Sequence, residues 1–544
     1  MCKYKIIDLF AGAGGLSYGF LQTEKFKICM AVEINKSAQE TYRLNHNNKN
    51  IEIRDDIVRI DFKDVKNRYG DIDFIIGGPP CQGFSNANRQ RNTLISNNNK
   101  LVKEYIRAIE DVKPKGFVLE NVKTMDSKKH RFYLSNEDMY DSIIKSMSKT
   151  EEVIEIAYGD YLTQFIAERL YLNITKDNIG EYLLDKKTIS FIKNISKSKK
   201  LGEYLEKNKQ LWNIEQREWI NKHTNYFCDK YKDIFIQLYD SIFNFIGEEK
   251  DEIIRLSSII LNSQNLLHKY KELLDNDIIF DKFIIEDKKI KVKLVSYNIF
   301  SYVKEKLDSL GYDTEHFILN AADYGVAQQR KRLILIGIKK EILNKRKIEA
   351  PKPIVTNDNY MTIKNAIKDL QEYKYVYEID KDNGIQRNEE ATNKLAKYLS
   401  DCGIMKNMVI TNTGEIALER FKELKQGENF HDLDEKFKST YSNPARTQSS
   451  IYKRLKYDEP SGTVTNIRKA MWIHPVKNRA LSIREAARLQ SFPDSFVFVG
   501  TKDSQYQQIG NAVPPMMARV IAETVLELIG DKPNTKYLRE IILE

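Results

Sequence analysis

Cys81 is the residue whose setting most clearly allows chemistry. It stands in the segment GGPPCQGFS, directly after an apolar run and beside two prolines. A structural cysteine more usually lies inside an apolar run, whereas Cys is intrinsically nucleophilic even when only a few per cent of the thiol is ionised. From this setting alone, a nucleophile and an ordinary cysteine both remain open.

The other cysteines are Cys2, Cys29, Cys228 and Cys402, and they are scattered without a CxxC pair. This pattern argues against a zinc cage or a disulfide framework and indicates a reducing, cytoplasmic setting.

Charged side chains flank two further apolar runs. Glu120 lies near the end of Gly116–Val122, where a carboxylate could contact a ring nitrogen of a substrate or donate a proton. Arg330 and Arg332 alternate just before the next apolar run, so both should point to the same side and could bind a phosphate or a carboxylate. An ordinary strand-end acid and a solvated basic edge are the alternatives.

Glycines follow the first apolar run, in the segment DLFAGAGG at Asp8–Gly15. A glycine turn between a strand and a helix lets the backbone approach a nucleotide-like ligand closely. Glu33 ends the second run, where an acidic residue about 20 residues on binds ribose hydroxyls in such folds. Asp56 follows the third run in the same way. We expect these strand ends to form one ligand crevice, with a tight turn and solvated carboxylates as the alternatives.

The elements that must position these residues alternate between two patterns. Apolar runs predict strands at Tyr4–Phe10, Lys27–Val32, Ile51–Ile53, Asp73–Ile76 and Gly116–Val122, with a helix at Leu101–Val112. This rhythm predicts a parallel sheet with helices on both faces. It breaks over 125–294, which is mostly helical in period, and resumes with a helix at Val295–Leu310 and strands at Thr314–Asn320 and Leu333–Ile338. A helical insertion therefore interrupts the α/β unit.

Residues 341–481 have frequent turn residues and no clear α/β rhythm, which predicts a separate, irregular second domain. Helices are expected to follow at Ser482–Gln490 and Val513–Ile529.

The whole chain of 544 residues has a net charge of +10, which permits a polyanionic partner without requiring one. The insertion 125–294 holds 28 basic and 29 acidic residues, whereas the rest holds 59 and 48. A polyanion is therefore not expected to bind the insertion, and no apolar run reaches transmembrane length.

Taken together, the motifs FAGAGG, VEIN, GGPPCQGFS, ENV, QQRKR, RLQSFPDSF and QIGNAVPP resemble the DNA (cytosine-5) methyltransferase family in content and in order. The resemblance covers about 1–124, 295–340 and 445–530. It implies a Rossmann-like, S-adenosylmethionine-dependent large domain and a smaller target-recognition domain. The implied division is a large domain in two parts, 1–124 and 295–340, the helical insertion 125–294, the small domain 341–498, and 499–544 with a C-terminal helix returning to the large domain.

The resemblance also implies a role for individual residues. Cys81 would attack cytosine, Glu120 would engage its ring, and Arg330 and Arg332 would steady the site. The S-adenosylmethionine site would be formed by Phe10, Gly12, Gly14, Leu16, Glu33, Asp56, Ile57, Pro80, Leu101, Asn511 and Val513. Contacts to DNA would come from Gln82, Ser85, Lys453, Arg454 and Lys456. No metal is implied.

The expected partner is double-stranded DNA, with a cognate restriction endonuclease as a further candidate, and the expected form is a monomer without a membrane anchor. Three other readings remain. Some relatives methylate tRNA, and the basic region 446–469 does not separate the two substrates. A catalytically silent DNA-binding relative would have no need of the intact Cys81, Glu120 and arginine motifs. A dehydrogenase would share the glycine turn and Glu33 but has no use for Cys81 beside two prolines.

Overall fold

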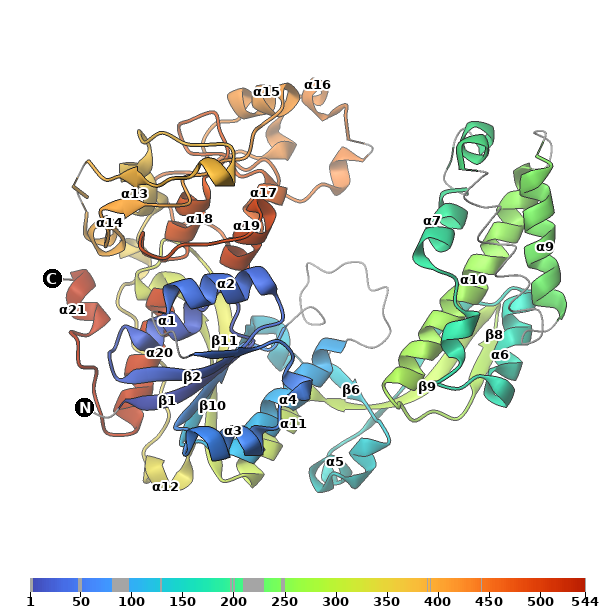
Figure 1. Cartoon of the computed structure of the whole chain (residues 1–544), viewed down its shortest axis with the longest axis horizontal. Coiled ribbons are helices and arrows are strands. Elements are labelled where there is room, and N and C mark those ends of the chain that lie inside the picture. Colours follow the sequence, from blue (N-terminus) through green and yellow to red (C-terminus); the bar gives the residue numbers. More distant parts are fainter. Residues whose placement is uncertain are drawn as a thin grey trace. The chain divides into compact units, whose positions relative to one another are not determined.

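A computed structural model describes residues 3–46, 51–80, 97–127, 130–195, 198, 201–208, 229–245, 250–388, 390–391, 393–441 and 443–543. The chain divides into two compact units (Figure 1). Unit 1 consists of Met1–Ser85, Asn98–Asp126 and Val303–Glu544, and unit 2 of Asn86–Asn97 and Ser127–Tyr302. Unit 2 thus interrupts unit 1 close to where the sequence pattern predicts an insertion.

Unit 1 is built on a seven-stranded sheet with the order β10-β11-β5-β4-β1-β2-β3. Its strands are β1 (Tyr4–Leu9), β2 (Phe26–Val32), β3 (Glu52–Arg54), β4 (Phe74–Gly77), β5 (Gly116–Val122), β10 (Tyr312–Asn320) and β11 (Lys331–Lys339). Neighbouring strands from β5 to β3 run parallel, and β11 runs antiparallel to both β5 and β10. The predicted strands of the α/β unit are confirmed, with ends that shift by one or two residues.

Helices cover the sheet and bring the C-terminal segment back to its start. The helices α3 (Phe62–Tyr69), α4 (Asn97–Val112) and α11 (Ile299–Ser309) lie together on one side (Figure 1). Two others, α1 (Gly15–Leu21) and α20 (Pro515–Leu528), pack tightly against each other. A Cβ atom at Gly19 would lie 2.5 Å from the Cβ of Ala518 and 2.6 Å from a main-chain oxygen of Pro515. Only glycine at position 19 permits this close approach.

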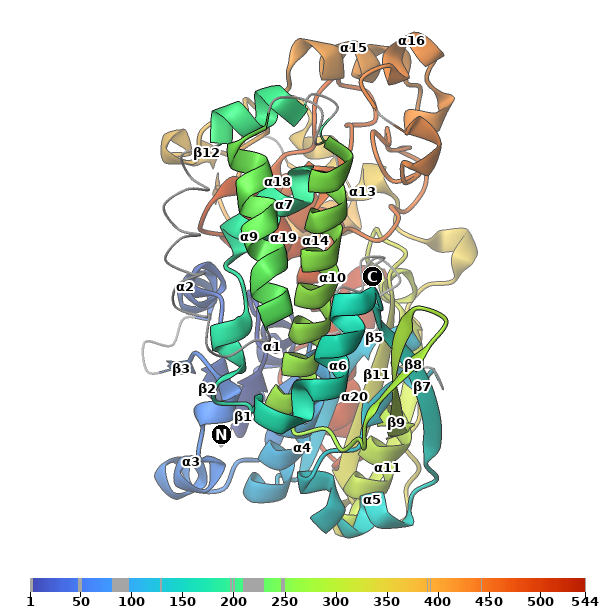
Figure 2. The same cartoon turned by 90° about the vertical axis from the view of Figure 1, so that its right-hand side faces the viewer.

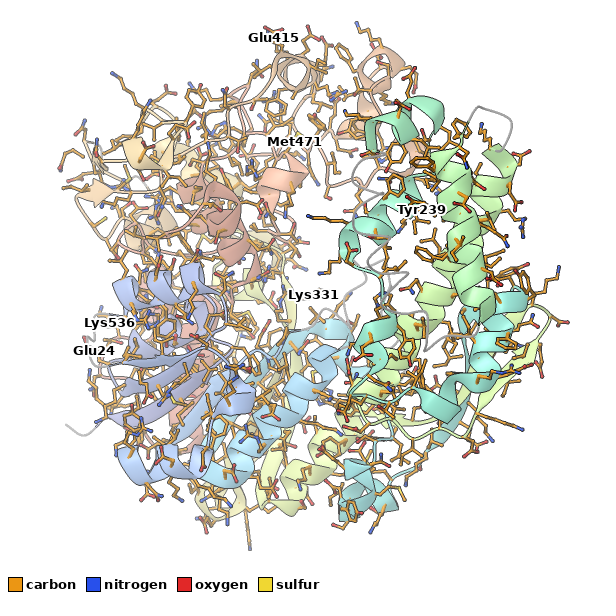
Figure 3. The ribbon with its side chains drawn as sticks, turned by 45° about the vertical axis from the view of Figure 1, so that its right-hand side comes forward. Glu24, Tyr239, Lys331, Glu415, Met471 and Lys536 are labelled. Carbon is orange, nitrogen blue, oxygen red and sulfur yellow. The ribbon has the colours of Figure 1, made fainter. Side chains whose placement is uncertain are left out.

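The C-terminal segment also docks beside the turn between α1 and β2. The amide N–H of Asn534 donates to the carbonyl of Thr23 at 3.0 Å, and Lys25 forms a 2.7 Å ion pair with Asp531. Glu24 and Lys536, labelled in Figure 3, mark this junction. Residues more than 500 positions apart in the chain therefore complete one folded unit.

The small part of unit 1, residues 341–511, consists mainly of short helices. The sequence pattern predicts a separate irregular domain here, but the contacts place this segment within unit 1. Its longest helices are α15 (Glu415–Glu423) and α19 (Lys502–Asn511), and its one sheet among the described residues pairs β12 (Ile385–Gln386) with β13 (Ile404–Met405). Buried ion pairs organise it around α18 (Ile483–Leu489). Arg488 contacts Asp369 at 2.7 Å and Asp494 at 2.6 Å. A capping box between Ser482 and Glu485 starts α18.

Unit 2 has its own hydrophobic core between helices and an antiparallel sheet (Figure 2). The helices include α6 (Tyr161–Asn173), α7 (Lys186–Ile195), α9 (Asp229–Phe243) and the long α10 (Lys250–Asp275). The strands are β6 (Arg131–Tyr133), β7 (Thr150–Tyr158), β8 (Phe283–Glu286) and β9 (Lys289–Asn298). The insertion is therefore mixed rather than only helical. In neither unit do the described residues include a helix long and apolar enough to cross a membrane.

The predicted helix at Val295–Leu310 needs correction, because its first four residues complete β9. Lysines alternate with buried Ile290, Val292 and Leu294 along this strand, which is the period of two that a half-buried strand requires. The helix α11 begins only after Asn298, whose side chain accepts a hydrogen bond from the N–H of Ser301 at 2.9 Å. An amide at this position is a favoured helix cap.

Candidate active site

The glycine turn after β1 has the backbone shape that its sequence predicts. Phe10, Gly12 and Gly14 have φ angles of 58°, 57° and 93°, in the left-handed region that costs an ordinary side chain energy. A Cβ atom at Gly14 would lie 2.1 Å from the ring of His46, whereas one at Gly12 would meet no atom within 4 Å. The turn is thus fixed by packing at Gly14 and open on the side of Gly12.

Glu33 lies against this turn from the end of β2. Its two carboxylate oxygens accept hydrogen bonds from the amides of Gly12 at 2.8 Å and Asn35 at 2.7 Å. Burial raises the pKa of Glu33, although these amides and that of Ile34 act in the opposite direction. The predicted pair of turn and acidic residue is therefore brought together.

Two exposed apolar side chains flank the acidic residues at the ends of β2 and β3. Ile34 is 73% exposed next to Glu33, and Val58 is 60% exposed two residues after Asp56. Asp56 caps a short 3₁₀ helix by accepting from the amide of Val58 at 3.1 Å. Exposed apolar side chains beside carboxylates suit a flat ring with polar edges. The sequence prediction missed Ile34 and Val58, although an apolar residue inside VEIN was a readable signal.

A buried polar cluster supports the turn from below. The Tyr42 hydroxyl donates to Asp8 at 3.0 Å, and the Tyr42 ring stacks on that of His46 with centroids 3.7 Å apart. The Ser17 hydroxyl lies 2.9 Å from Nε2 of His46. Burial raises the pKa of Asp8 to about 7 and lowers that of His46 to about 4. The neutral form of His46 therefore persists well below pH 6. The packing of this buried cluster holds the glycine turn in place.

Glu120 forms a second centre at the end of β5. Its Oε1 atom lies 2.9 Å from Nε of Arg332 on the adjacent antiparallel strand β11. Lys331, labelled in Figure 3, marks where that strand begins. A Cβ atom at Gly78 would lie 2.7 Å from Oε2 of Glu120, so a larger residue there would displace the carboxylate. The carboxyl group therefore faces the turn that leads into Cys81.

Asn121 fixes the same turn. Its side-chain amide donates to the carbonyl of Pro79 at 3.0 Å, two residues before Cys81. Pro80 is the last described residue of the turn, and the predicted site residues Cys81, Gln82 and Ser85 lie outside the described part of the chain. The sequence prediction included neither Gly78 nor Asn121, although both stand inside the motifs that carry it.

Burial raises the pKa of Glu120, whereas the positive charges of Arg332 and Arg330 act in the opposite direction. A carboxyl group in this balance can carry a proton closer to neutral pH than an exposed one. It could donate a hydrogen bond to a ring nitrogen that gains electron density. The pair of Glu120 and Arg332 is therefore suited to acid–base work on a bound ring.

Arg330 connects the start of β11 to the small part of unit 1 and does not face the Glu120–Arg332 pair directly. Its guanidinium donates to the carbonyls of Val464 at 2.9 Å and Gly510 at 2.8 Å. Gln328 acts beside it: its Oε1 accepts from the amide of Val464 at 2.7 Å. These buried contacts join the start of β11 to the small part of unit 1. Arg330 is best described as a positioning residue, and Gln328 is a further one that the prediction missed.

The remaining cofactor residues of the prediction lie on the elements around the turn. Leu16 is buried in α1, Ile57 is buried beside Asp56, and Leu101 is half-buried in α4. Val513 follows α19, and its carbonyl would lie 2.3 Å from a Cβ atom at Gly15. Asn511 ends α19 and is exposed, with its side chain accepting from Gln507 at 2.8 Å.

Of the three basic residues predicted to contact DNA, Arg454 has a different role. It is 4% exposed, and all its N–H groups are directed at acceptors within the protein. Those acceptors are the carbonyls of Phe421, Leu424, His474, Pro475 and Lys477 and the side chain of Asn478. These contacts disfavour the predicted DNA contact and make Arg454 a structural residue. Lys453 is half-buried, and Lys456 is exposed and paired with Glu459.

The fold and site together resemble those of Rossmann-like enzymes: a glycine turn after β1 held by Glu33, and a Glu120–Arg332 pair on β5 and β11. The model of C-5 cytosine-specific DNA methylases matches residues 4–152 and 262–527. The chain therefore belongs to the C-5 cytosine-specific DNA methylase family and is a DNA cytosine methyltransferase. This result excludes the dehydrogenase reading. The stretch between the two matched parts, 153–261, lies within unit 2.

Individual relatives agree with this family. Type II methyltransferase M.DdeI of Desulfomicrobium norvegicum is 24% identical over 538 residues, which span 96% of this chain and 88% of the relative. Type II methyltransferase M1.HphI of Haemophilus parahaemolyticus is 34% identical over 226 residues, 42% of this chain and 51% of the relative. Among solved structures, a prophage-encoded DNA modification methyltransferase of E. coli has the same fold, with a TM-score of 0.55 at 20% identity, covering 97% of this chain and all of that one.

Proposed function

We propose that this enzyme methylates carbon 5 of a cytosine flipped out of duplex DNA, with Cys81 as the nucleophile. The observation that carries the proposal is the Glu120 carboxyl, held by Arg332 and facing the Gly78 turn that leads into Cys81. Several relatives are named Type II methyltransferases, which supports a place in restriction–modification with a cognate endonuclease as partner. We expect a cytoplasmic monomer.

The chemistry explains why these residue types are needed. Carbon 5 of cytosine is a poor nucleophile until a thiolate adds to carbon 6. In that step the Cys81 sulfur forms a bond to carbon 6, and the ring electrons move toward nitrogen 3. The protonated Glu120 carboxyl then donates to nitrogen 3 and stabilises the developing charge. Carbon 5 then takes a methyl group from S-adenosylmethionine, which would be released as S-adenosylhomocysteine. Water takes the proton from carbon 5, nitrogen 3 returns its proton to Glu120, and the carbon 6–sulfur bond breaks to release the Cys81 thiolate.

The proposed methyl donor is S-adenosylmethionine, which supplies an electrophilic methyl group when bound. The residues around the glycine turn fit it. The open side of Gly12 leaves space for a close approach, and the Glu33 carboxylate at the strand end can accept from ribose hydroxyls. Ile34 and Val58 offer apolar surface for the adenine ring, and Asp56 offers acceptors at its edge.

Glu33→Ala should weaken S-adenosylmethionine binding by roughly 1–3 kcal/mol, because hydrogen bonds to a charged acceptor are lost. Calorimetry on the protein without DNA measures this directly. Asp55→Ala is a matched control, because Asp55 is an exposed carboxylate nearby whose ion pair is with Lys36. If the two variants bind equally well, Glu33 does not hold the cofactor.

Bisulfite mapping of DNA co-expressed with the chain tests the proposed function, with tRNA as a parallel substrate. We expect methylation at cytosines within one defined duplex sequence and none in tRNA. The base must leave the helix to reach Cys81, at a cost of a few kcal/mol. Phosphate contacts by the basic small part of unit 1 can offset this cost. Methylation confined to tRNA would overturn the choice of substrate.

The DNA contacts can be separated from the structural arginine. Replacing Lys453 and Lys456 together by Ala should weaken binding to all duplexes and reduce the salt slope by about one unit per lost phosphate contact. Arg454→Ala should instead lower the free energy of unfolding by roughly 3–5 kcal/mol, because several buried carbonyls lose their donor at about 1–3 kcal/mol each. Salt titrations and thermal melts distinguish these effects. A double variant with an unchanged salt slope would remove both lysines from the interface.

A further inference from the structure

One loop of the small part of unit 1, residues 443–450, is held through its backbone, whereas its Arg446 and Gln448 side chains are exposed. It contains a 3₁₀ turn, Pro444–Arg446, closed by a hydrogen bond from the amide of Thr447 to the carbonyl of Pro444 at 3.1 Å. The Thr447 carbonyl lies 2.8 Å from Nε2 of His431, and the Ser450 carbonyl accepts from the Trp472 indole at 3.1 Å. The loop is therefore anchored to the protein at its middle and at its C-terminal end.

The body beneath this loop is a compact module with its own apolar core. That core includes Phe421, Leu424, Phe430, Leu433, Tyr452 and Ile473. The buried Arg420 joins its layers by donating to the Tyr452 hydroxyl at 2.9 Å and to Thr440 at 2.6 Å. Met471, labelled in Figure 3 at the end of α17 (Ile467–Ala470), marks one edge of the module. The loop thus has a stiff support.

Two side chains of the loop take no part in the hydrogen bonds and ion pairs that stabilise the described fold. Arg446 and Gln448 are exposed, and neither side chain makes a hydrogen bond or ion pair with any described residue. The neighbouring lysines differ, because Lys438 pairs with Glu435 at 3.2 Å and Lys456 pairs with Glu459. The chain from 436 to 457 has six basic residues and no carboxylate, so the sequence around Arg446 favours an anionic partner.

We propose that Arg446 and Gln448 read base edges in the target DNA, with Arg446 on a guanine and Gln448 on an adenine. An arginine fork matches O6 and N7 of guanine in the major groove, and a glutamine amide matches N6 and N7 of adenine. Such readers need a fixed backbone and unpaired side chains, and loop 443–450 provides both. The assignment rests on the proposed function and specifies which side chains of the small part set the sequence.

The proposal is tested by measuring the DNA sequence that each variant methylates. Wild type, Arg446→Ala, Gln448→Ala and Lys438→Ala are each incubated with a library of randomised duplexes and S-adenosylmethionine, and methylated cytosines are read by bisulfite sequencing. Arg446→Ala should lose discrimination roughly tenfold to a hundredfold at one guanine position, and Gln448→Ala by a similar factor at one adenine position. Lys438→Ala should keep the wild-type sequence. Melting temperatures of the Arg446 and Gln448 variants should match that of wild type, because these two side chains are exposed.

Two outcomes would overturn the proposal. A uniform loss of methylation over all sequences would make Arg446 a phosphate contact, and an unchanged sequence preference would place the loop outside the interface. Gln448 is judged by its own adenine position in the same way. Failure of the proposed function is distinguishable, because wild type would then methylate no cytosine in the library.

Discussion

Cys81→Ala should abolish methyl transfer to DNA while leaving S-adenosylmethionine binding unchanged. Without the sulfur no bond forms at carbon 6, so carbon 5 never becomes nucleophilic. Cys81→Ser should be nearly as inactive, because a hydroxyl is far less ionised than a thiol at neutral pH. Transfer of a tritiated methyl group to duplex DNA measures the first effect, and calorimetry measures the second. The cofactor turn and Glu33 are not altered by either substitution.

The matched control is Cys402→Ala, since Cys402 is a half-buried cysteine of the small part whose thiol donates to the Ile404 carbonyl at 3.2 Å. Cys29→Ala in β2 is a second control. Both should retain activity. An active Cys81→Ala enzyme would exclude the covalent route.

Glu120→Gln should lower kcat by roughly a hundredfold to ten-thousandfold, the range that a positioned acid or base contributes. Gln has a similar shape and can still contact the ring, but it cannot transfer a proton to nitrogen 3. Binding of S-adenosylmethionine should be unchanged, because Glu120 lies outside the glycine turn. Single-turnover methylation under saturating DNA isolates this loss from any change in binding.

The pH profile adds a readout that a purely structural role of Glu120 would not produce. If its protonated form donates, kcat falls as pH rises through its raised pKa. Arg332 lowers that pKa, and so does Arg330. Arg332→Gln should therefore move the alkaline fall of kcat to higher pH, and the Glu120→Gln enzyme should lack this fall. An unchanged profile in Arg332→Gln would show that Glu120 is not the titrating group.

The motifs and their order were sufficient to predict the parallel strands and the meeting of Glu33 with the glycine turn. These features depend on local patterns: an apolar run, a turn of glycines and a polar residue at a strand end. The strand β9 was also readable, because lysines alternate with Ile290, Val292 and Leu294. The helical periodicity of its surroundings obscured that alternation.

The role of Arg454 could not be predicted in the same way. Its acceptors are main-chain carbonyls from two segments, Phe421 to Leu424 and His474 to Lys477, and carbonyls carry no sequence signal. Arg330 is similar, since its contacts with Val464 and Gly510 come from segments more than 130 residues away. A basic residue in a basic stretch looks like a surface contact until the tertiary fold places it inside.

In the proposed mechanism, Cys81 forms a covalent bond with the target cytosine. Duplex carrying 5-fluorocytosine at the target tests it, because fluorine at carbon 5 cannot leave as a cation and the adduct cannot resolve. With S-adenosylmethionine present, the wild-type enzyme should form a denaturation-resistant complex, and a tryptic map should place the adduct on Cys81. Cys81→Ala should form none, whereas Cys402→Ala and Cys29→Ala should be trapped. An adduct on another cysteine, or no complex with an enzyme that methylates ordinary duplex, would contradict the mechanism.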